Sequence, residues 1–447
     1  MNRKLLRRMT LPLIAACLVL ADCSNNNSSG TGPTTAFAVL RLTTASGSPD
    51  TSFAGGRGIT ITDIDPGLFD FAIAATVQPA DNKILAAGSS GLAGQGSVAM
   101  VRYNPDGSLD TGFGTGGIVR TTLPGVAATA SAIAVQPADN KILVAAVTFT
   151  ASTSTTGIAI LRYNSTGTLD TAGFGGGNGY VIATIGPGLA GDTCALALQG
   201  TNIIVAGAST NQNLVLHRYD TNGNLDATFG PGGTTTTPLA TAALSPAIAF
   251  QSTGNIILVS GTNVDQVVLR YSANGILDTT FGTNGIVTTD IGTSTNFANA
   301  LAVQSDDKIV VAGHANVNTS TGTSDISLVR YNADGTLDAT FVGPSGNPNP
   351  PGIVTTDLNG GFDNAFSVAL QTPLAAATNI LVSGNTGSGG ISQMAVLRYN
   401  TDGTLDTTFG PNASGVVIVS LVGPSNIASG NAVVLQTNLG IIVAGYD

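Results

Sequence analysis

The chain has 447 residues, of which 43% are hydrophobic and 9% are charged, and its formal net charge is −10. It has 58 Gly, no Glu and no Trp, a composition that disfavours helices and suits strands joined by tight turns. We therefore expect an all-β fold. Because an acidic surface repels phosphate backbones, we expect no nucleic-acid partner.

Residues 1–22 resemble an export signal, with a basic start and then an apolar run, Met9 to Leu20, that is short for a membrane span. The residues before Cys23, Leu-Ala-Asp, resemble the lipobox of bacterial lipoproteins, although Asp22 stands where that pattern has Gly, Ala or Ser. The resemblance implies cleavage before Cys23 and acylation of its thiol. Two alternatives stay open. Cys17 fits the box better but leaves a shorter apolar core, and the segment could be an ordinary cleaved secretory signal.

Residues 23–35 are rich in Ser, Asn and Gly, so we expect a flexible tether between the lipid anchor and the rest of the chain. Without residues 1–22 the chain would carry 12 basic and 25 acidic residues, a formal charge of −13. Cys194 is the only cysteine after Cys23, so acylation of Cys23 would leave it no partner for an intramolecular disulfide. Stability then has to come from packing.

Residues 36–447 repeat one unit seven times. The stretch Val329–Phe341 (VRYNADGTLDATF) has close relatives around seven arginines, which are Arg41, Arg102, Arg162, Arg218, Arg270, Arg330 and Arg398. Successive arginines lie between 52 residues (Arg218 to Arg270) and 68 residues (Arg330 to Arg398) apart. A period of this size indicates a repeat array that grows by adding units, so we expect residues 36–447 to form a single domain.

Each unit is expected to contain four strands, which are clearest in the fifth copy: Ala300–Gln304, Lys308–Gly313, Ile326–Tyr331 and Gly352–Asp357. The first strand of each unit ends at a repeated glutamine, which is Gln304 in the fifth copy. In nearly every copy, the residues two and four positions before this glutamine are small, and those one and three positions before it are mostly large. Successive strand residues point to opposite faces, so one face is flat, the other is bulky, and neither is polar. Such sheets bury both faces only between like neighbours, and stacking them around an axis gives a β-propeller.

The two ends of the chain predict the number of blades. The chain begins with a third and a fourth strand, Phe37–Leu42 and Gly58–Asp63, and ends with a first and a second, Ala432–Gln436 and Ile441–Gly445. Joined, these halves would complete one blade and leave no unpaired radial edge. We therefore predict a seven-bladed β-propeller of four-stranded antiparallel blades, with a ring closed by N- and C-terminal strands that share one blade.

Residues 36–447 resemble the bacterial delta-60 repeat family. The likeness rests on the seven copies of a motif such as Leu397–Gly410 (LRYNTDGTLDTTFG), each linked to a segment like Ala300–Gly313. The resemblance implies a propeller of unassigned function in exported or surface-attached proteins, and it brings no catalytic residues. The copies depart from the pattern only locally, as where Leu42 replaces the tyrosine and Ala146 replaces a glycine.

The motif also predicts a structural ion pair in every unit. Its Arg and Asp lie eight residues apart in six copies and nine apart in the first (Arg41 and Asp50), and a chain reversal at the intervening Gly would bring them together. We expect a partly buried pair that holds the unit together. The six regular pairs are Arg102 and Asp110, Arg162 and Asp170, Arg218 and Asp226, Arg270 and Asp278, Arg330 and Asp338, and Arg398 and Asp406.

Other candidate sites are explained better by structural roles. The stretch Asn332–Asp338 resembles part of a calcium loop, but its central acid is Thr or Asn in other copies, and Asn-Gly and Asp-Gly are common turn pairs. The repeated Tyr and Phe residues suit packing between blades. His217 and His314 have no visible catalytic partner, and Cys194 is expected in the core. We therefore predict no catalytic, cofactor-binding or metal-binding residues, and no cofactor.

Function is expected at one end of the propeller. The connections from the first to the second strand and from the third to the fourth share the regular end, which carries the repetitive turns. The others share the variable end, whose loops differ in length and sequence: Ser89–Gly96, Val147–Gly157, His314–Asp325, Gly384–Ser392, Asp65–Asp70 and Asn359–Asp363. Loops on a rigid scaffold commonly carry function.

The leading hypothesis is a monomeric, non-catalytic binding or scaffolding lipoprotein of the bacterial cell envelope, in the outer membrane. It would bind a protein or glycan through the variable end and touch the membrane only through its lipid anchor. A secreted or periplasmic location is the alternative. Two other functions stay open: a propeller enzyme, such as a hydrolase or lyase with a site at the axial mouth, and a purely structural surface protein.

Overall fold

A computed structural model describes residues 35–92, 96–150, 155–183, 185, 193–241, 243–262, 264–292, 295–318, 323–358, 360–371, 378–421, 427–437 and 440–447. The predicted signal, Cys17, Cys23 and the tether up to residue 34 lie outside these residues. The described part contains strands β1 to β28 and three single-turn 3₁₀ helices, Ala54–Gly56, Gly175–Gly177 and Pro411–Ala413. The all-β prediction is confirmed. In this part of the chain, no helix has the length and apolarity needed to cross a membrane.

Five sheets have four antiparallel strands each. In sheet order, they are β3 (Phe69–Val77), β4 (Ile84–Gly91), β5 (Ser97–Tyr103) and β6 (Ile118–Thr121); β7 (Ala127–Val135), β8 (Ile142–Thr150), β9 (Thr155–Tyr163) and β10 (Tyr180–Ala183); β11 (Ala195–Gln199), β12 (Asn202–Ala208), β13 (Asn213–Tyr219) and β14 (Thr234–Pro238); β15 (Ala243–Phe250), β16 (Ile256–Thr262), β17 (Gln266–Tyr271) and β18 (Ile286–Thr289); and β27 (Ser429–Gln436), β28 (Gly440–Tyr446), β1 (Phe37–Leu42) and β2 (Ile59–Thr62).

The sixth sheet has eight strands, which differs from the prediction of separate four-stranded blades. They are β19 (Thr295–Val303), β20 (Ile309–Asn318), β21 (Thr323–Tyr331) and β22 (Ile353–Thr356), joined to β23 (Phe362–Gln371), β24 (Asn379–Ser388), β25 (Ile391–Tyr399) and β26 (Val416–Val419). The junction is one parallel pair, Ser324 with Phe362. It forms because β21 extends far enough for the Ser324 N–H to reach the Gly361 carbonyl, at 3.1 Å.

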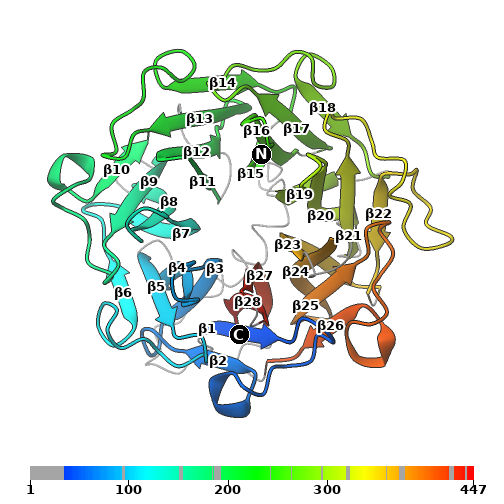
Figure 1. Cartoon of the computed structure of the whole chain (residues 1–447), viewed down its shortest axis with the longest axis horizontal. Coiled ribbons are helices and arrows are strands. Elements are labelled where there is room, and N and C mark those ends of the chain that lie inside the picture. Colours follow the sequence, from blue (N-terminus) through cyan, green and yellow to red (C-terminus); the bar gives the residue numbers. More distant parts are fainter. Residues whose placement is uncertain are drawn as a thin grey trace, which may run out of the picture.

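The strand groups lie around a common centre (Figure 1). We refer to β3–β6 as unit 1, β7–β10 as unit 2, β11–β14 as unit 3, β15–β18 as unit 4, β19–β22 as unit 5, β23–β26 as unit 6, and β27, β28, β1 and β2 as unit 7. The first strand of each unit faces the centre, and the fourth lies outermost (Figure 1). In unit 7, β1 pairs with β28 from Phe37 opposite Tyr446 to Leu42 opposite Ile441.

The hydrophobic core lies between the units. Each of seven clusters combines buried side chains from two neighbouring units: Leu85 and Met100 of unit 1, for example, pack with Ile142 and Leu161 of unit 2. Both faces of a sheet are thereby covered, as the alternation of small and large residues predicted. Burial of apolar surface between sheets is therefore the main stabilising contribution to the fold.

The hairpins at the variable end are longer than the sequence predicted, which corrects the loop boundaries. The predicted loop Gly384–Ser392 is largely a two-stranded ladder, in which Ser388 pairs with Ile391. Gly313 and Gly384 looked like strand ends, but they lie within β20 and β24. A Cβ on Gly384 would lie 1.8 Å from the Asn364 carbonyl oxygen, because a β-bulge between Ala365 and Ser367 brings the first strand close.

Candidate functional site

The repeated Arg and Asp side chains meet at the regular end. In all seven copies the Arg Nε lies 2.7 to 2.8 Å from Oδ2 of its Asp. The pairs differ in exposure. The side chains of Arg330 and Asp338 are 5% and 4% exposed, whereas those of Arg270 and Asp278 are 14% and 23% exposed.

Each of these arginines also contacts the following unit. Its guanidinium lies 4.3 to 4.8 Å from the centre of a Phe ring in its own unit. Its Nη1 donates to a turn carbonyl of the following unit, and Arg398 of unit 6 reaches unit 7. In chain order from Arg41, the acceptors belong to Pro105, Ser165, Thr221, Ala273, Ala333, Thr401 and Thr44. The arginines are therefore structural links within and between units.

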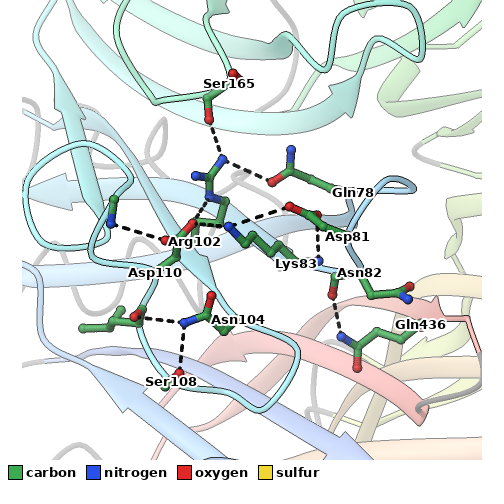
Figure 2. A network of polar contacts seen from close by, with 12 residues as sticks. Gln78, Asp81, Asn82, Lys83, Arg102, Asn104, Ser108, Asp110, Ser165 and Gln436 are labelled. Atoms are coloured by element: carbon green, nitrogen blue, oxygen red, sulfur yellow. Dashed lines mark hydrogen bonds and ion pairs between the residues drawn. The ribbon is translucent and has the colours of Figure 1, made fainter.

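Three lysines join this network, and the sequence reasoning missed them. Lys83, Lys141 and Lys308 place Nζ 2.9 to 3.1 Å from Asp110, Asp170 and Asp338, respectively. Figure 2 shows one such network, in which Asp110 forms ion pairs with both Arg102 and Lys83. The signal was present as Asp-Asn-Lys-Ile or Asp-Asp-Lys-Ile shortly after the repeated glutamine.

The network keeps these carboxylates charged. Burial raises the pKa of Asp338, but hydrogen bonds from Thr340 and Lys308 and the charge of Arg330 outweigh burial and hold that pKa well below its usual range. An open pocket of about 300 Å³ lies beside this pair, between units 5 and 6. Both of its cations, Lys308 and Arg330, are ion-paired with Asp338. Its lining residues are Gln304, Asp306, Lys308, Arg330, Thr340, Thr401 and Asp402.

The repeated aromatic side chains pack between units. Tyr331 is fully buried, and its hydroxyl bonds to Thr289 of unit 4 at 2.5 Å. Phe281 is fully buried against the turn of the next unit, where a Cβ on Gly335 would lie 2.7 Å from the ring. The same Phe and Gly contact recurs in every unit, ending with Phe409 of unit 6 on Gly47 of unit 7. These glycines are required both by their positive φ and by the neighbouring ring.

Both histidines are buried at structural positions. His217 is 6% exposed, and its Nδ1 lies 2.9 Å from the Thr234 hydroxyl. His314 is 6% exposed, stacks on Phe297 and lies 3.2 Å from the Asn299 amide nitrogen. Burial lowers the pKa of His314 to about 3, so this imidazole is neutral at pH 7. Cys194 is buried, and burial raises the pKa of its thiol to about 12.

The variable end exposes large apolar side chains at corresponding places. Leu92, Phe149, Val264 and Ile391 are 39 to 54% exposed, and all four lie where the second strand of a unit connects to the third. Exposed apolar residues elsewhere are less regular. Leu225, Ile276 and Val342 occupy different motif positions at the regular end, and Ile61, Ile182 and Ile418 lie on outermost strands.

The variable end also holds acidic groups where neighbouring units meet. Asp325, Asp357 and Asp363 each bring a carboxylate oxygen within 4.8 Å of the others. Asp363 is fully buried at the start of β23, and burial raises the pKa of its carboxyl, an effect that the charges of Asp357 and Asp325 strengthen. Sequence reasoning missed this cluster because its members lie on three different segments.

The comparisons with known proteins give a family match over part of the chain. Residues 80–113, 138–172, 202–229, 304–341 and 379–409 match the model described as "Domain of unknown function (DUF5122) beta-propeller". Each matched segment includes the Arg and Asp of one motif. No curated protein matches the chain.

Three of the similar solved structures illustrate how distant the structural matches are. A protein of unknown function from Dyadobacter fermentans is 14% identical, with a TM-score of 0.38 over 58% of this chain and 78% of that chain. An exo-β-1,3-galactanase from Phanerochaete chrysosporium is 10% identical, with a TM-score of 0.37 over 91% and 96%. An α-L-arabinofuranosidase from Fusarium graminearum is 10% identical, with a TM-score of 0.43 over 82% and 98%. The likeness is one of fold alone. The match of five segments to a β-propeller model supports a β-propeller repeat family, in line with the propeller-like arrangement of the sheets.

Proposed function

We propose that the protein is a non-catalytic binding or scaffolding protein that contacts a protein or glycan through the variable end. The observation that carries this proposal is the placement of Leu92, Phe149, Val264 and Ile391 at equivalent hairpin connections of four units. Apolar side chains that converge on one end of a rigid scaffold are typical of an interaction surface. The regular end instead places its charged side chains in ion pairs that hold the units together.

The enzyme hypothesis has less support. The chain has no Glu, and both of its histidines are buried. The motif aspartates are engaged by Arg, and in three units also by Lys. The acidic groups at the variable end could still act as a general acid or base. A catalytic acid or base must also be positioned against a bound substrate.

We also propose that the units form a seven-bladed ring that closes through unit 7, and that the chain is of the delta-60 type. Seven inter-unit core clusters and seven Arg contacts to the next unit support the closed ring. The contact from Arg398 to the Thr44 carbonyl and the pairing of β1 with β28 lie at the closing unit.

For location, we propose an exported lipoprotein of the cell envelope that is acylated at Cys23. The support is the basic and apolar pattern of residues 1–22 and the lipobox-like residues before Cys23. Metabolic labelling with palmitate should label the wild type and Cys17→Ala but not Cys23→Ala. Labelling lost only in Cys17→Ala would mean that Cys17 is the lipidated residue. An unlabelled wild type would contradict lipidation.

The binding proposal is tested with two matched triple variants. Leu92→Ser, Phe149→Ser and Ile391→Ser change the variable end, whereas Leu225→Ser, Ile276→Ser and Val342→Ser change exposed apolar residues at the regular end. Glycan arrays and envelope-protein capture are compared with the wild type. The proposal expects ligands of the wild type to be kept by the regular-end variant and lost by the variable-end variant. The reverse result, or a hydrolase activity of the wild-type protein, would contradict it.

A further inference from the structure

Three carboxylates meet where units 5 and 6 join. They form a candidate site that is separate from the apolar residues of the proposed binding surface. Asp325 lies near the start of β21, Asp357 directly follows β22, and Asp363 is the second residue of β23. One oxygen from each lies within 4.8 Å of the other two. Asp357 is exposed, Asp325 is half-buried and Asp363 is fully buried, so the cluster reaches from the surface into the junction.

Asp363 is held by only one of its two oxygens. Oδ2 accepts a hydrogen bond from the Leu358 N–H at 2.6 Å, which fixes the carboxylate in the junction. Oδ1 is buried and has no hydrogen-bond partner among the described residues. Thr386, its register partner on β24, favours the charged form of Asp363, but the Thr386 hydroxyl also lacks a well-formed hydrogen bond there. A buried anionic oxygen without a donor calls for a positive partner.

The preceding junction has two acids and one amide at the same positions. Asp265, Asp290 and Asn296 occupy, between units 4 and 5, the places of Asp325, Asp357 and Asp363. There the Asn296 Nδ2 donates to Asp290 Oδ1 at 3.4 Å and to the Val264 carbonyl at 3.3 Å. A neutral amide donates to one of the acids at that junction, and its own buried Oδ1, although uncharged, has no hydrogen-bond partner among the described residues. In unit 6 a carboxylate replaces the amide and adds a negative charge.

Two of the three acids, Asp357 and Asp363, have no basic partner in the described part of the chain. No Lys or Arg there forms an ion pair with Asp357 or Asp363. Unlike the motif aspartates, whose Arg and Lys partners are built into the repeat, these acids lie at the variable end. Like charges at such a separation repel unless a cation or a proton intervenes.

We propose that Asp325, Asp357 and Asp363 bind one Ca²⁺ at the junction of units 5 and 6. The donor set contains only carboxylate oxygens, which hard cations prefer. Two oxygens bound to one Ca²⁺ lie at most about 5 Å apart, a limit that the cluster meets, and Ca²⁺ tolerates irregular geometry better than Mg²⁺. The ion would tie β21, the segment after β22 and β23 together at the variable end.

The test is calorimetric titration of the purified, EDTA-stripped chain with CaCl₂ and, in parallel, with MgCl₂. The wild type is expected to bind one Ca²⁺ and to unfold at a higher temperature when Ca²⁺ is present. Asp357→Asn and Asp363→Asn are each expected to weaken Ca²⁺ binding by roughly tenfold or more, because each removes a charged ligand. Asp363→Asn recreates the residue set of the preceding junction, so it is expected to fold.

Asp290→Asn is the matched control, since it changes the equivalent acid of the preceding junction and should leave Ca²⁺ binding unchanged. In EDTA, Asp357→Asn should unfold at the same temperature as the wild type or higher, because it removes repulsion. The proposal is overturned if the wild type binds no Ca²⁺ or prefers Mg²⁺. It is also overturned if both cluster variants bind normally, if Asp290→Asn loses binding equally, or if Asp357→Asn is destabilised in EDTA.

Discussion

At the scale of single residues, the seven Arg and Asp pairs that link the units differ in how deeply they are buried. Arg330 and Asp338 are almost fully buried and share Lys308, whereas Arg270 and Asp278 are partly exposed and have no lysine partner among the described residues. Removing one member of a buried pair leaves the other charge uncompensated in a poorly solvated site. The same substitution should therefore have different effects in units 4 and 5.

Arg330→Ala is expected to lower the free energy of unfolding by about 3 to 5 kcal/mol, as for other buried pairs. Arg270→Ala, its matched control, is expected to cost less, about 1 to 3 kcal/mol, as for a hydrogen bond to a charged group. Guanidinium-induced unfolding of both variants measures the difference. Equal losses, or no loss for Arg330→Ala, would show that burial does not determine the strength of these links.

His314 makes the stability of the fold depend on pH. The imidazole has a pKa of about 3 in the folded chain, whereas an unfolded histidine has a pKa near 6.5. Below pH 6.5 the unfolded state therefore binds a proton that the folded state does not. The buried neutral imidazole of His314 therefore makes its full contribution to stability above pH 6.5, and this contribution is progressively lost as the pH falls from 6.5 towards 3.

His314→Asn removes this titration and keeps a polar side chain, since Asn385 occupies the equivalent position in unit 6. Between pH 6.5 and 5 the wild type should lose about 2 kcal/mol more than the variant. Unfolding midpoints across that range measure the difference, and other titrating groups cancel in the comparison. Parallel pH profiles for the two proteins would mean that His314 is protonated in the folded chain.

At the scale of the structural element, the turn between the third and fourth strands is shaped by the preceding unit. Gly335 and Gly346 both have a φ of +90°, but only Gly335 faces a ring, that of Phe281. Comparing the two therefore separates the cost of the backbone conformation from the cost of the contact. The sequence pattern indicated a turn glycine, but it did not show that a side chain from another repeat fills the space.

Gly346→Ala is expected to cost about 1 to 2 kcal/mol, which is the price of a left-handed conformation for a residue with a Cβ. Gly335→Ala should cost about 1 to 3 kcal/mol more, because the added methyl overlaps the Phe281 ring. Thermal unfolding of the two variants tests the difference. If both lose the same stability, the ring adapts at no cost and the inter-unit contact is loose.

The elements that the sequence predicted well are those that every repeat contains. The strand alternation around Ala300–Gln304 and the position of Arg330 and Asp338 recur seven times, so chance variation in one copy does not obscure them. The boundaries of the hairpins at the variable end were predicted less well, because glycines such as Gly384 accommodate a bulge instead of ending a strand. That role depends on the neighbouring strand and not on local sequence.

At the scale of the whole molecule, contacts between distant segments decide what the sequence alone could not show. Asp325, Asp357 and Asp363 lie on three segments and meet only where two units join. The single pairing of Ser324 with Phe362, which merges units 5 and 6 into one sheet, likewise depends on how far β21 extends. The pairing of the first and last strands could be predicted from the sequence. Strands β1 and β2 match the third and fourth strands of a repeat, and β27 and β28 match its first and second.

The central claim is that the first and last strands pair to complete unit 7, and a designed disulfide tests it most directly. Val39 of β1 is opposite Ala444 of β28, and both belong to one core cluster, whereas the adjacent Val443 faces the other side. In the double variant Val39→Cys and Ala444→Cys, peptide mapping should find these two cysteines linked after oxidation. The control, Val39→Cys with Val443→Cys, should remain unlinked. Failure of the first pair to link, or equal linking of both pairs, would contradict the shared sheet.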